Sequence, residues 1–426
     1  MRRAMPERYI YIMVKRLFSL LFHNKLELLL SICMFSNLYP SFLPNAAYYA
    51  AFVGIGFAAL RCHAASTVRT LPTLALMGVI LLSTFHSGGI NARSLTMCFL
   101  LFVTMAWSSE EYFHFKYRFL FISLLLYAFT SVINCYAKFA GINFYETVQS
   151  NIWGSSSGEF SGLTCHPMWL SAACGIGTIF FVYAMVVRYK RGDTYAAAAM
   201  GLASLASLWT AMQGGSRSAS GIAILCSLFL ILVSFEDGAK KKKLLVPILF
   251  IGVLTIPLMA TGNEQFKRKQ GGLSLYDDNG ETSRTALWKA RIDEFQSEPA
   301  LGIGFGKHKG GYEGSTETGS GWLTALAQTG IAGFALVCFL VYRTRLSLAE
   351  LKVDSTVALF QSVMLFLLLH SLFEAYMFQI GWYMCLFFWL LASTLDDYKT
   401  YGTIPDMEGD LFGEEDDEEE EESVTV

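Results

Sequence analysis

Two arginines, Arg217 and Arg284, are the side chains of this sequence best suited to bind phosphate. Arg217 lies in the small-residue stretch GGSRSASG before an apolar segment, and Arg284 begins the amphipathic stretch SRTALWKARIDEFQ. A guanidinium presents a planar fork of donors that matches phosphate oxygens, and the free N–H groups of helix N-termini add to such a site. The pair therefore predicts a site that stabilises negative charge. The alternatives are a membrane-anchoring arginine and a solvated loop arginine.

Other residues in or next to the polar connections of the chain are candidates for proton transfer or for substrate contact. His166 precedes a helix-initiating proline in TCHP, where it either caps the helix or takes part in the chemistry. Glu317 is the nearest candidate for a general base toward a hydroxyl group, with a solvated loop acid as the alternative. We expect substrate contacts from Arg291, Ser216, Ser218, Gly304, Gly306, His308 and Trp322.

The sequence offers no pattern typical of a metal, nucleotide or nucleic-acid site. Its nine cysteines are scattered without paired spacing, and no carboxylate cluster suggests a bound cation. GIGFG resembles a nucleotide-binding glycine loop, but it follows no predicted strand. We therefore expect no metal, no cofactor and no nucleic-acid partner.

Apolar segments long enough to cross a bilayer position these candidates. Hydrophobic residues make up 54% of the 426 residues, which is high for a soluble protein. We predict an all-α membrane protein with about twelve spans, because helices satisfy their own backbone groups in lipid. The predicted spans are 26–43, 45–61, 70–86, 92–108, 117–138, 167–187, 194–212, 219–235, 243–260, 322–342, 356–376 and 379–395.

Basic residues occur in every second connection and predict the orientation of these spans. They cluster at 1–25, 61–69, 116–118, 188–191, 240–243 and 343–352. Because Lys and Arg concentrate on the cytoplasmic side, both termini are expected there. The connections 87–91, 139–166, 213–218 and 261–321 then face outward, and the last is a large loop of the kind that carries function.

The chain divides into a transmembrane domain, 1–396, which includes the outer loop 261–321, and an acidic tail, 397–426. Residues 406–422 are rich in Asp and Glu and contain no basic side chain, so the rest of the chain is basic. Like charges repel, and the tail is predicted to be disordered and cytoplasmic. A cytoplasmic partner for the tail is a further expectation.

Four motifs, in this order, resemble the O-antigen ligase and Wzy polymerase superfamily of bacterial envelope glycan assembly. They are GLTCHPMWLS (162–171), GGSRSASG (214–221), SRTALWKARIDEFQSEPALGIGFG (283–306) and WLTALAQTGIAG (322–333). The resemblance covers roughly residues 150–340, and the family's two arginines correspond to Arg217 and Arg284. It also includes the Pro-x-x-Gly-x-Gly-x-Gly signature that begins at Pro299.

This resemblance implies a GT-C-like glycosyltransferase in the bacterial inner membrane with its active site facing outward. Donor and acceptor are polyprenyl-pyrophosphate-linked glycans, the enzyme also contacts membrane lipid, and the reaction is inverting and metal-independent. Ligases of the family often carry a histidine before the span that follows the large loop, but this chain has Thr318-Gly319-Ser320-Gly321. That difference favours a polymerase of repeat units over a ligase of finished glycan. A transporter of polysaccharide or small molecules is the alternative from another class.

Overall fold

The computed structural model describes residues 15–44, 46–62, 67–144, 160–235, 238, 283–308 and 319–402, and within them every regular element is a helix. The all-α prediction is therefore confirmed for the described residues. In chain order the helices are α2 (Lys25–Phe35), α3 (Ala46–Arg61), α4 (Thr67–His86), α5 (Ala92–Leu101), the π-helix η1 (Phe102–Ala106), α6 (Glu110–Phe139), α8 (Pro167–Lys190), α9 (Thr194–Gln213), α10 (Arg217–Ser234), α13 (Ser283–Ser297), α14 (Gly321–Arg343), α15 (Leu348–Val353), α16 (Ser355–His370) and α17 (Tyr383–Tyr401).

The lengths and apolar composition of these helices identify a multi-pass membrane protein. Among the described residues, five helices are long and apolar enough to cross a bilayer, namely α6, α8, α9, α10 and α14. Shorter apolar helices, α3, α4, α5 with η1, and α16, add to them. Every predicted span in the described ranges overlaps a helix, whereas the predicted span 243–260 lies outside these ranges.

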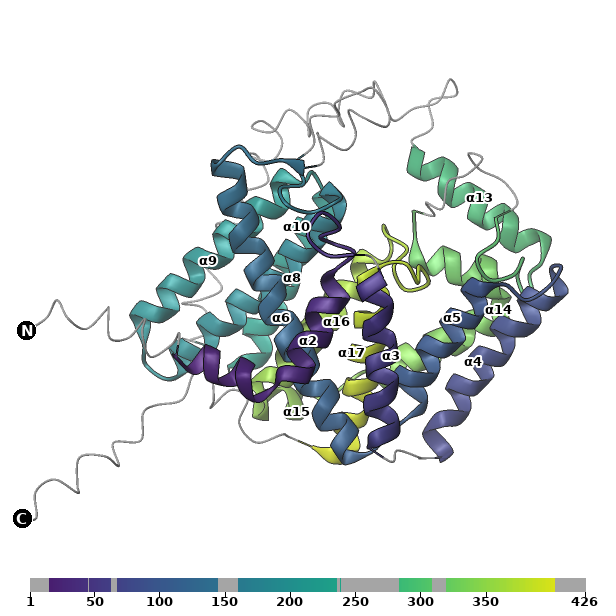
Figure 1. The fold of residues 1–426 in the computed structure, drawn as a ribbon, viewed down its shortest axis with the longest axis horizontal. Coiled ribbons are helices and arrows are strands. Elements are labelled where there is room, and N and C mark those ends of the chain that lie inside the picture. The colour runs from purple at the N-terminus through teal and green to yellow at the C-terminus, as the bar shows by residue number, and fades with distance from the viewer. Residues whose placement is uncertain are drawn as a thin grey trace, which may run out of the picture.

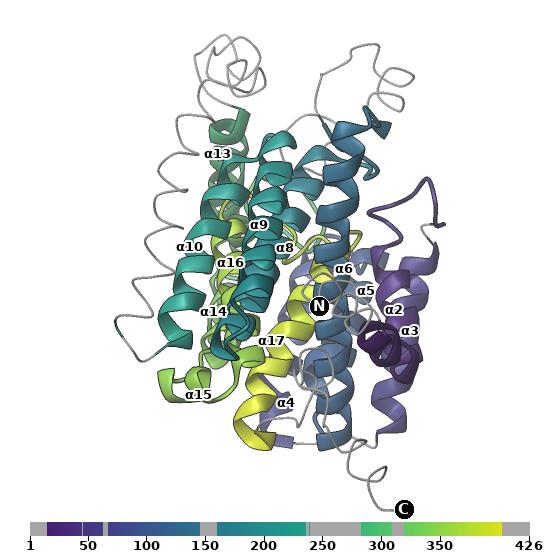
Figure 2. The same ribbon diagram turned by 90° about the vertical axis from the view of Figure 1, so that its left-hand side faces the viewer.

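Two groups of helices are joined by α17. In the first group, α8 packs against α6, α9, α10 and α16, and in the second, α14 packs against α4 and α13. Helix α17 contacts α6 and α16 on one side and η1, α5 and α14 on the other, so it lies between the groups (Figure 1). Its residues from Tyr383 to Tyr398 are all buried. Figure 2 shows α13 at one end of the bundle and α15 at the opposite end, and we call these the α13 end and the α15 end.

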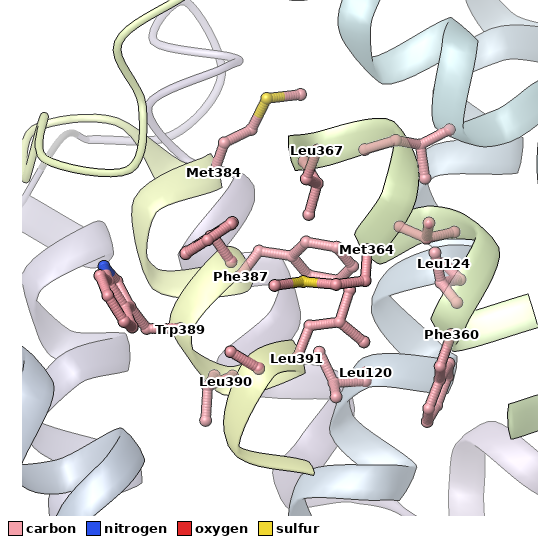
Figure 3. Packing of buried hydrophobic residues seen from close by; sticks show 14 of the residues in the cluster. Leu120, Leu124, Phe360, Met364, Leu367, Met384, Phe387, Trp389, Leu390 and Leu391 are labelled. Carbon is pink, nitrogen blue, oxygen red and sulfur yellow. The ribbon is translucent and has the colours of Figure 1, made fainter. Parts of the chain in front are cut away.

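The core between α6, α16 and α17 consists of interlocking apolar side chains. Phe387 and Leu391 of α17 lie against Met364 of α16 and Leu120 of α6, and all four are fully buried (Figure 3). In a bilayer the lipid is as apolar as these side chains, so close packing rather than escape from water holds the helices together. The core therefore fixes the relative positions of the helices that reach the α13 end.

Charged side chains join the helices at the α15 end. The Lys116 ammonium is 2.5 Å from the Asp397 carboxylate, and Arg343 pairs with Asp396. Lys190 donates to the hydroxyl of Ser355 at 3.2 Å. Three predicted cytoplasmic clusters, 116–118, 188–191 and 343–352, therefore meet at one end of the bundle, as the orientation prediction requires.

Three predicted spans differ from the helices that the chain forms. The first, 26–43, is wrong as a continuous helix, because α2 ends at Phe35 and meets the preceding helix, Lys15–His23, at 92°. The eleventh, 356–376, is too long, because α16 ends at His370. Beyond this end, the carbonyls of Ser371 and Glu374 accept the Gly321 N–H at the start of α14. They therefore have a hydrogen-bond partner although the helix does not continue.

The twelfth predicted span, 379–395, is displaced, because α17 begins at Tyr383 and continues to Tyr401. The predicted domain boundary at 396 consequently falls inside this helix. Asp397 lies in the described part of the predicted acidic tail, and it is buried and paired with Lys116. Residues 403–426, which include the acidic run, lie outside the described residues.

Candidate functional site

Three predicted helix starts at the α13 end are confirmed, and each has a side-chain cap. His166 accepts the Met168 N–H at 3.2 Å through Nδ1, with Pro167 at the first helical position of α8. Ser216 accepts the Ala219 N–H at 3.3 Å and caps α10, and Ser320 caps α14. His166 therefore caps α8, as one of its two predicted roles requires, because one ring nitrogen accepts a free N–H at the start of the helix.

Arg217 is the first residue of α10 and is exposed at the α13 end. The preceding residue, Ser216, is buried, and its N–H donates to the Ser171 hydroxyl near the start of α8 at 3.4 Å. A Cβ on Gly214 would lie 2.6 Å from the Pro167 carbonyl oxygen, so only glycine allows this approach. The small residues of GGSRSASG therefore hold the start of α10, and Arg217 with it, against the start of α8.

Ser218 and Trp322, two further predicted substrate contacts, take part in local packing. The Ser218 hydroxyl is 3.2 Å from that of Ser216, and Ser218 is partly buried. The Trp322 indole N–H donates to the Leu368 carbonyl at 3.1 Å and its ring lies 6.2 Å from Phe334. Trp322 thus joins α14 to α16.

The predicted loop helix exists as α13, and Arg284 lies in its first turn. The side chain of Arg284 is outside the described part of the structure, as is all of Glu317. Trp288 fixes α13 to the start of α14, because its indole N–H donates to the Gly319 carbonyl at 3.0 Å. The apolar face of this amphipathic helix is incompletely buried, since Ile292 is 42% exposed.

The glycine-rich segment 299–308 is tightly turned and fills a break in α14. Gly302, Gly304 and Gly306 have φ values of 77°, 97° and 73°, a region that favours glycine. The Ile303 N–H donates to the Ala327 carbonyl at 2.9 Å, next to Gly330, where α14 is interrupted. The segment therefore satisfies backbone groups that the break in α14 leaves available.

The same segment is also attached to α4 and to the start of α5. The Phe305 N–H donates to the Thr84 hydroxyl at 3.1 Å, and the Asn91 side-chain amide donates to the Phe305 carbonyl at 2.8 Å. A Cβ on Gly304 would lie 2.8 Å from the Ser87 hydroxyl, and one on Gly306 would lie 3.0 Å from the Arg93 side chain. Close backbone approach is thus the visible role of both glycines, which we had predicted to contact substrate.

A cavity of about 400 Å³ lies between the glycine segment, the start of α5 and the connection before α17, a volume within the usual range of ligand sites. Its lining residues come from six parts of the chain and are Tyr49, Ala92, Arg93, Thr96, Trp169, Phe305, Gly306, His308, Thr324, Gln328, Ala375, Phe378, Gln379, Ile380 and Gly381. Of the predicted site residues, Gly306 and His308 line it.

Four residues that line the cavity were not predicted from the sequence: Arg93, Trp169, Gln328 and Gln379. Only the position of Arg93 could have been recognised in the sequence. Arg93 directly follows the connection 87–91, which was predicted to face outward, and arginine is disfavoured on that side of a membrane. The rule that selected Arg217 therefore selects Arg93 as well. Gln328 and Gln379 carry no such signal, because their positions depend on the break in α14 and on the connection before α17.

His308 lies between this cavity and a second one of about 390 Å³, which Glu298 and Lys307 also line. Arg291 of α13 contacts Nδ1 of His308 and forms an ion pair of 2.8 Å with Glu294, and both members of that pair are buried. An arginine can only donate, so Nδ1 must accept. The proton of a neutral imidazole then belongs on Nε2, which makes His308 a hydrogen-bond donor in this geometry and not a base.

The charge state of His308 agrees with that role. Burial lowers the pKa of the imidazole to about 4, and the positive charges of Arg291 and Arg93 act in the same direction. Burial also lowers the pKa of the Arg291 guanidinium, and the neighbouring Glu294 carboxylate opposes this. A neutral imidazole beside a cationic guanidinium is the result near neutral pH.

The connection 371–382 links the two halves of the α13 end. Trp382 packs against Trp169 of α8 with ring centroids 4.7 Å apart and the rings tilted by 32°, and Phe373 lies 6.3 Å from Trp288 of α13. Figure 1 shows this connection between the α10 and α13 sides of the bundle. The starts of α8, α10, α13, α14 and α17 thus share one end of the molecule.

Comparison with known protein families matches residues 176–338 to the family described as O-antigen ligase. The matched region begins in α8, includes α10 and α13 with the glycine segment, and ends in α14. No curated protein matches the chain. The match covers both predicted arginines, Arg217 and Arg284, and the starts of α10, α13 and α14 at the α13 end. Residues 176–338 are thus similar to the O-antigen ligase family, which agrees with the resemblance to the O-antigen ligase and Wzy polymerase superfamily.

Proposed function

We propose that this protein is a glycosyltransferase that polymerises oligosaccharide repeat units carried on polyprenyl pyrophosphate. It acts at the outer face of a bacterial cytoplasmic membrane, in a bundle of about twelve spans whose termini lie in the cytoplasm. The α13 end faces outward, in agreement with the basic clusters at the α15 end. The observation that carries the proposal is the position of Arg217, in the first turn of α10 at the same end as the Arg284 turn of α13.

The reaction is a displacement at the anomeric carbon of the donor. A hydroxyl oxygen of the acceptor forms the new glycosidic bond, and the bond between the anomeric carbon and the diphosphate oxygen breaks. The electron pair leaves with the lipid diphosphate, and the configuration at the carbon inverts. Arg217 and Arg284 balance the charge that develops on the diphosphate, and the helix N-terminus of α10 adds to this stabilisation.

The hydroxyl proton needs an acceptor, and Glu317 is the candidate. It lies in the loop between the glycine segment and α14, and a carboxylate there can take the proton as the new bond forms. His166 has a different role in this proposal. Its Nδ1 accepts the Met168 N–H, so the proton of a neutral ring is on Nε2, which suits a hydrogen-bond donor to the diphosphate. His308 is likewise a hydrogen-bond donor, toward the part of the substrate that lies in the cavity it lines.

Transfer of a finished glycan to a lipid or protein acceptor is the second candidate function. The description of the matched family, O-antigen ligase, favours it. The stretch Thr318-Gly319-Ser320-Gly321 favours the polymerase, because it lacks the histidine that ligases of the superfamily often carry at this place. In cells the two functions leave different products: loss of a polymerase leaves single repeat units, and loss of a ligase leaves long chains on the carrier.

The test is reconstitution of the purified protein with a lipid-linked repeat unit, with and without a chelator. We expect a ladder of chain lengths in both cases. Arg217→Ala and Arg284→Ala should abolish the ladder, while Arg345→Ala, an exposed arginine just after α14, should retain it. Arg217→Lys should also lose most activity, because an ammonium lacks the bidentate fork. A normal ladder from Arg217→Ala or Arg284→Ala removes that arginine from the mechanism, and transfer to an added acceptor without a ladder identifies a ligase.

A further inference from the structure

The cavity that Gly306 and His308 line contains an arginine that the proposed chemistry does not use. Arg93 lies in the first turn of α5, is exposed, and its aliphatic stem covers Gly306. No acidic side chain is among the residues that line this cavity in the described part of the chain. The cavity therefore combines one permanent positive charge with no negative charge, which favours an anionic ligand.

Gln328 provides a second and independent indication of a ligand. This residue of α14 is 3% exposed and lines the cavity, and its Oε1 has no hydrogen-bond partner among the described residues. Its backbone carbonyl is already used, because the Ser83 hydroxyl donates to it at 2.8 Å. A buried amide oxygen without a donor is energetically unfavourable, so a hydroxyl that enters the cavity gains a ready acceptor.

Aromatic rings and a second amide complete the lining. Trp169 is partly buried and held by Trp382, with ring centroids 4.7 Å apart, while Tyr49 is 52% exposed at the rim. Gln379 adds another amide. Sugars present C–H faces to aromatic rings and hydroxyl groups to amides, so a few polar groups between aromatic side chains suit a saccharide.

We propose that this cavity is a subsite for an acidic sugar residue of the glycan substrate. Arg93 pairs with the carboxylate of the sugar, Gln328 accepts one of its hydroxyl groups, and Trp169 contacts its C–H face. The Nε2–H of His308 is a further donor to the ligand. That the ligand is a glycan rests on the proposed function, whereas the need for an acidic group comes from the cavity itself.

The test is a saturation-transfer NMR titration of the full-length protein in detergent micelles with methyl glucuronide, methyl glucoside and inorganic pyrophosphate. We expect the glucuronide to bind more tightly than the glucoside by roughly tenfold or more. The reason is that its carboxylate can form a charge-assisted hydrogen bond with Arg93, which the glucoside cannot form. Arg93→Gln should remove this preference, and Arg345→Gln, the matched control outside the cavity, should keep it. Gln328→Leu should weaken both sugars.

Three results would overturn the subsite. They are equal binding of the two glycosides by the unmodified protein, an unchanged preference in Arg93→Gln, and Arg93-dependent binding of pyrophosphate that displaces the glucuronide. The last result would assign the cavity to the diphosphate of a lipid carrier. Polymerisation is measured separately: a normal ladder without sugar preference rejects the subsite alone, and Arg93-dependent glucuronide binding without any ladder rejects the proposed function alone.

Discussion

At the scale of single residues, His308 shows how neighbours decide the chemistry of a side chain. A free histidine titrates near neutral pH and serves as base or acid. Here Arg291 donates to Nδ1, and burial lowers the pKa to about 4, so the ring stays neutral and donates through Nε2. The sequence identifies His308 as a candidate. It does not reveal this role, because Arg291 lies on another element and reaches His308 only in the folded chain.

The lowered pKa of His308 predicts a pH dependence of stability. The unfolded imidazole, with its pKa near 6.5, takes up a proton at a higher pH than the folded one, with its pKa of about 4. The contribution of His308 is thus fully present above about pH 6.5 and is lost as the pH falls toward 4. The thermal unfolding midpoint in detergent should therefore decrease more steeply between pH 7 and 5 in the unmodified protein than in His308→Gln. Parallel curves for the two proteins would contradict the assignment.

At the scale of elements, the break in α14 and the glycine segment depend on each other. Helix starts at His166, Ser216 and Ser320 were predictable, because capping and proline signals are local. The break at Gly330 was not, because it requires the Pro299 carbonyl, which accepts the Ile331 N–H at 2.9 Å from outside the helix. A periodicity rule sees one apolar helix here, and only the packed segment interrupts it.

Gly330→Ala should destabilise the protein. Gly330 has a φ of 62°, and a Cβ there would lie 2.3 Å from the Ala300 carbonyl oxygen, which is backbone and has no room to move away. We expect a loss of roughly 1–3 kcal/mol or more, measured as a lower unfolding midpoint in detergent. Gly78→Ala in α4 is the control, since no atom lies within 4 Å of its Cβ position, and it should be neutral or stabilising. Equal effects of the two substitutions would show that α14 has no rigid break.

At the scale of the whole molecule, α17 holds the two helix groups together through its core face and one buried ion pair. Lys116 of α6 is fully buried and contacts Asp397 of α17 at 2.5 Å and the Ser393 hydroxyl at 2.6 Å. Asp397 also accepts the Ser108 hydroxyl at 2.7 Å. The sequence suggested that Asp397 begins a disordered tail, because acidic residues dominate the following stretch. Its partner, Lys116, lies far away in the chain, so the local composition led to a wrong prediction for Asp397.

Asp397→Asn should destabilise the bundle, because it leaves the buried Lys116 ammonium without its counter-charge. The expected loss is about 3–5 kcal/mol, seen as a lower unfolding midpoint. Arg118→Gln is the control: its guanidinium is 41% exposed and 3.8 Å from Glu27, so its loss should cost about 0–1 kcal/mol. If Asp397→Asn has no larger effect than the control, the pair contributes no stability beyond that of a surface contact.

The sequence by itself determined where most helices lie, which connections are basic, and which family motifs the chain carries. These properties follow from apolar length, capping residues and short motifs, all of which are local. Only the tertiary structure decided that the glycine segment fills a break in α14, that Arg93 and Gln328 share a cavity with Trp169, and that Asp397 belongs to the core. The reason is physical: each depends on contacts between residues far apart in the chain, and side-chain packing and burial alone select them.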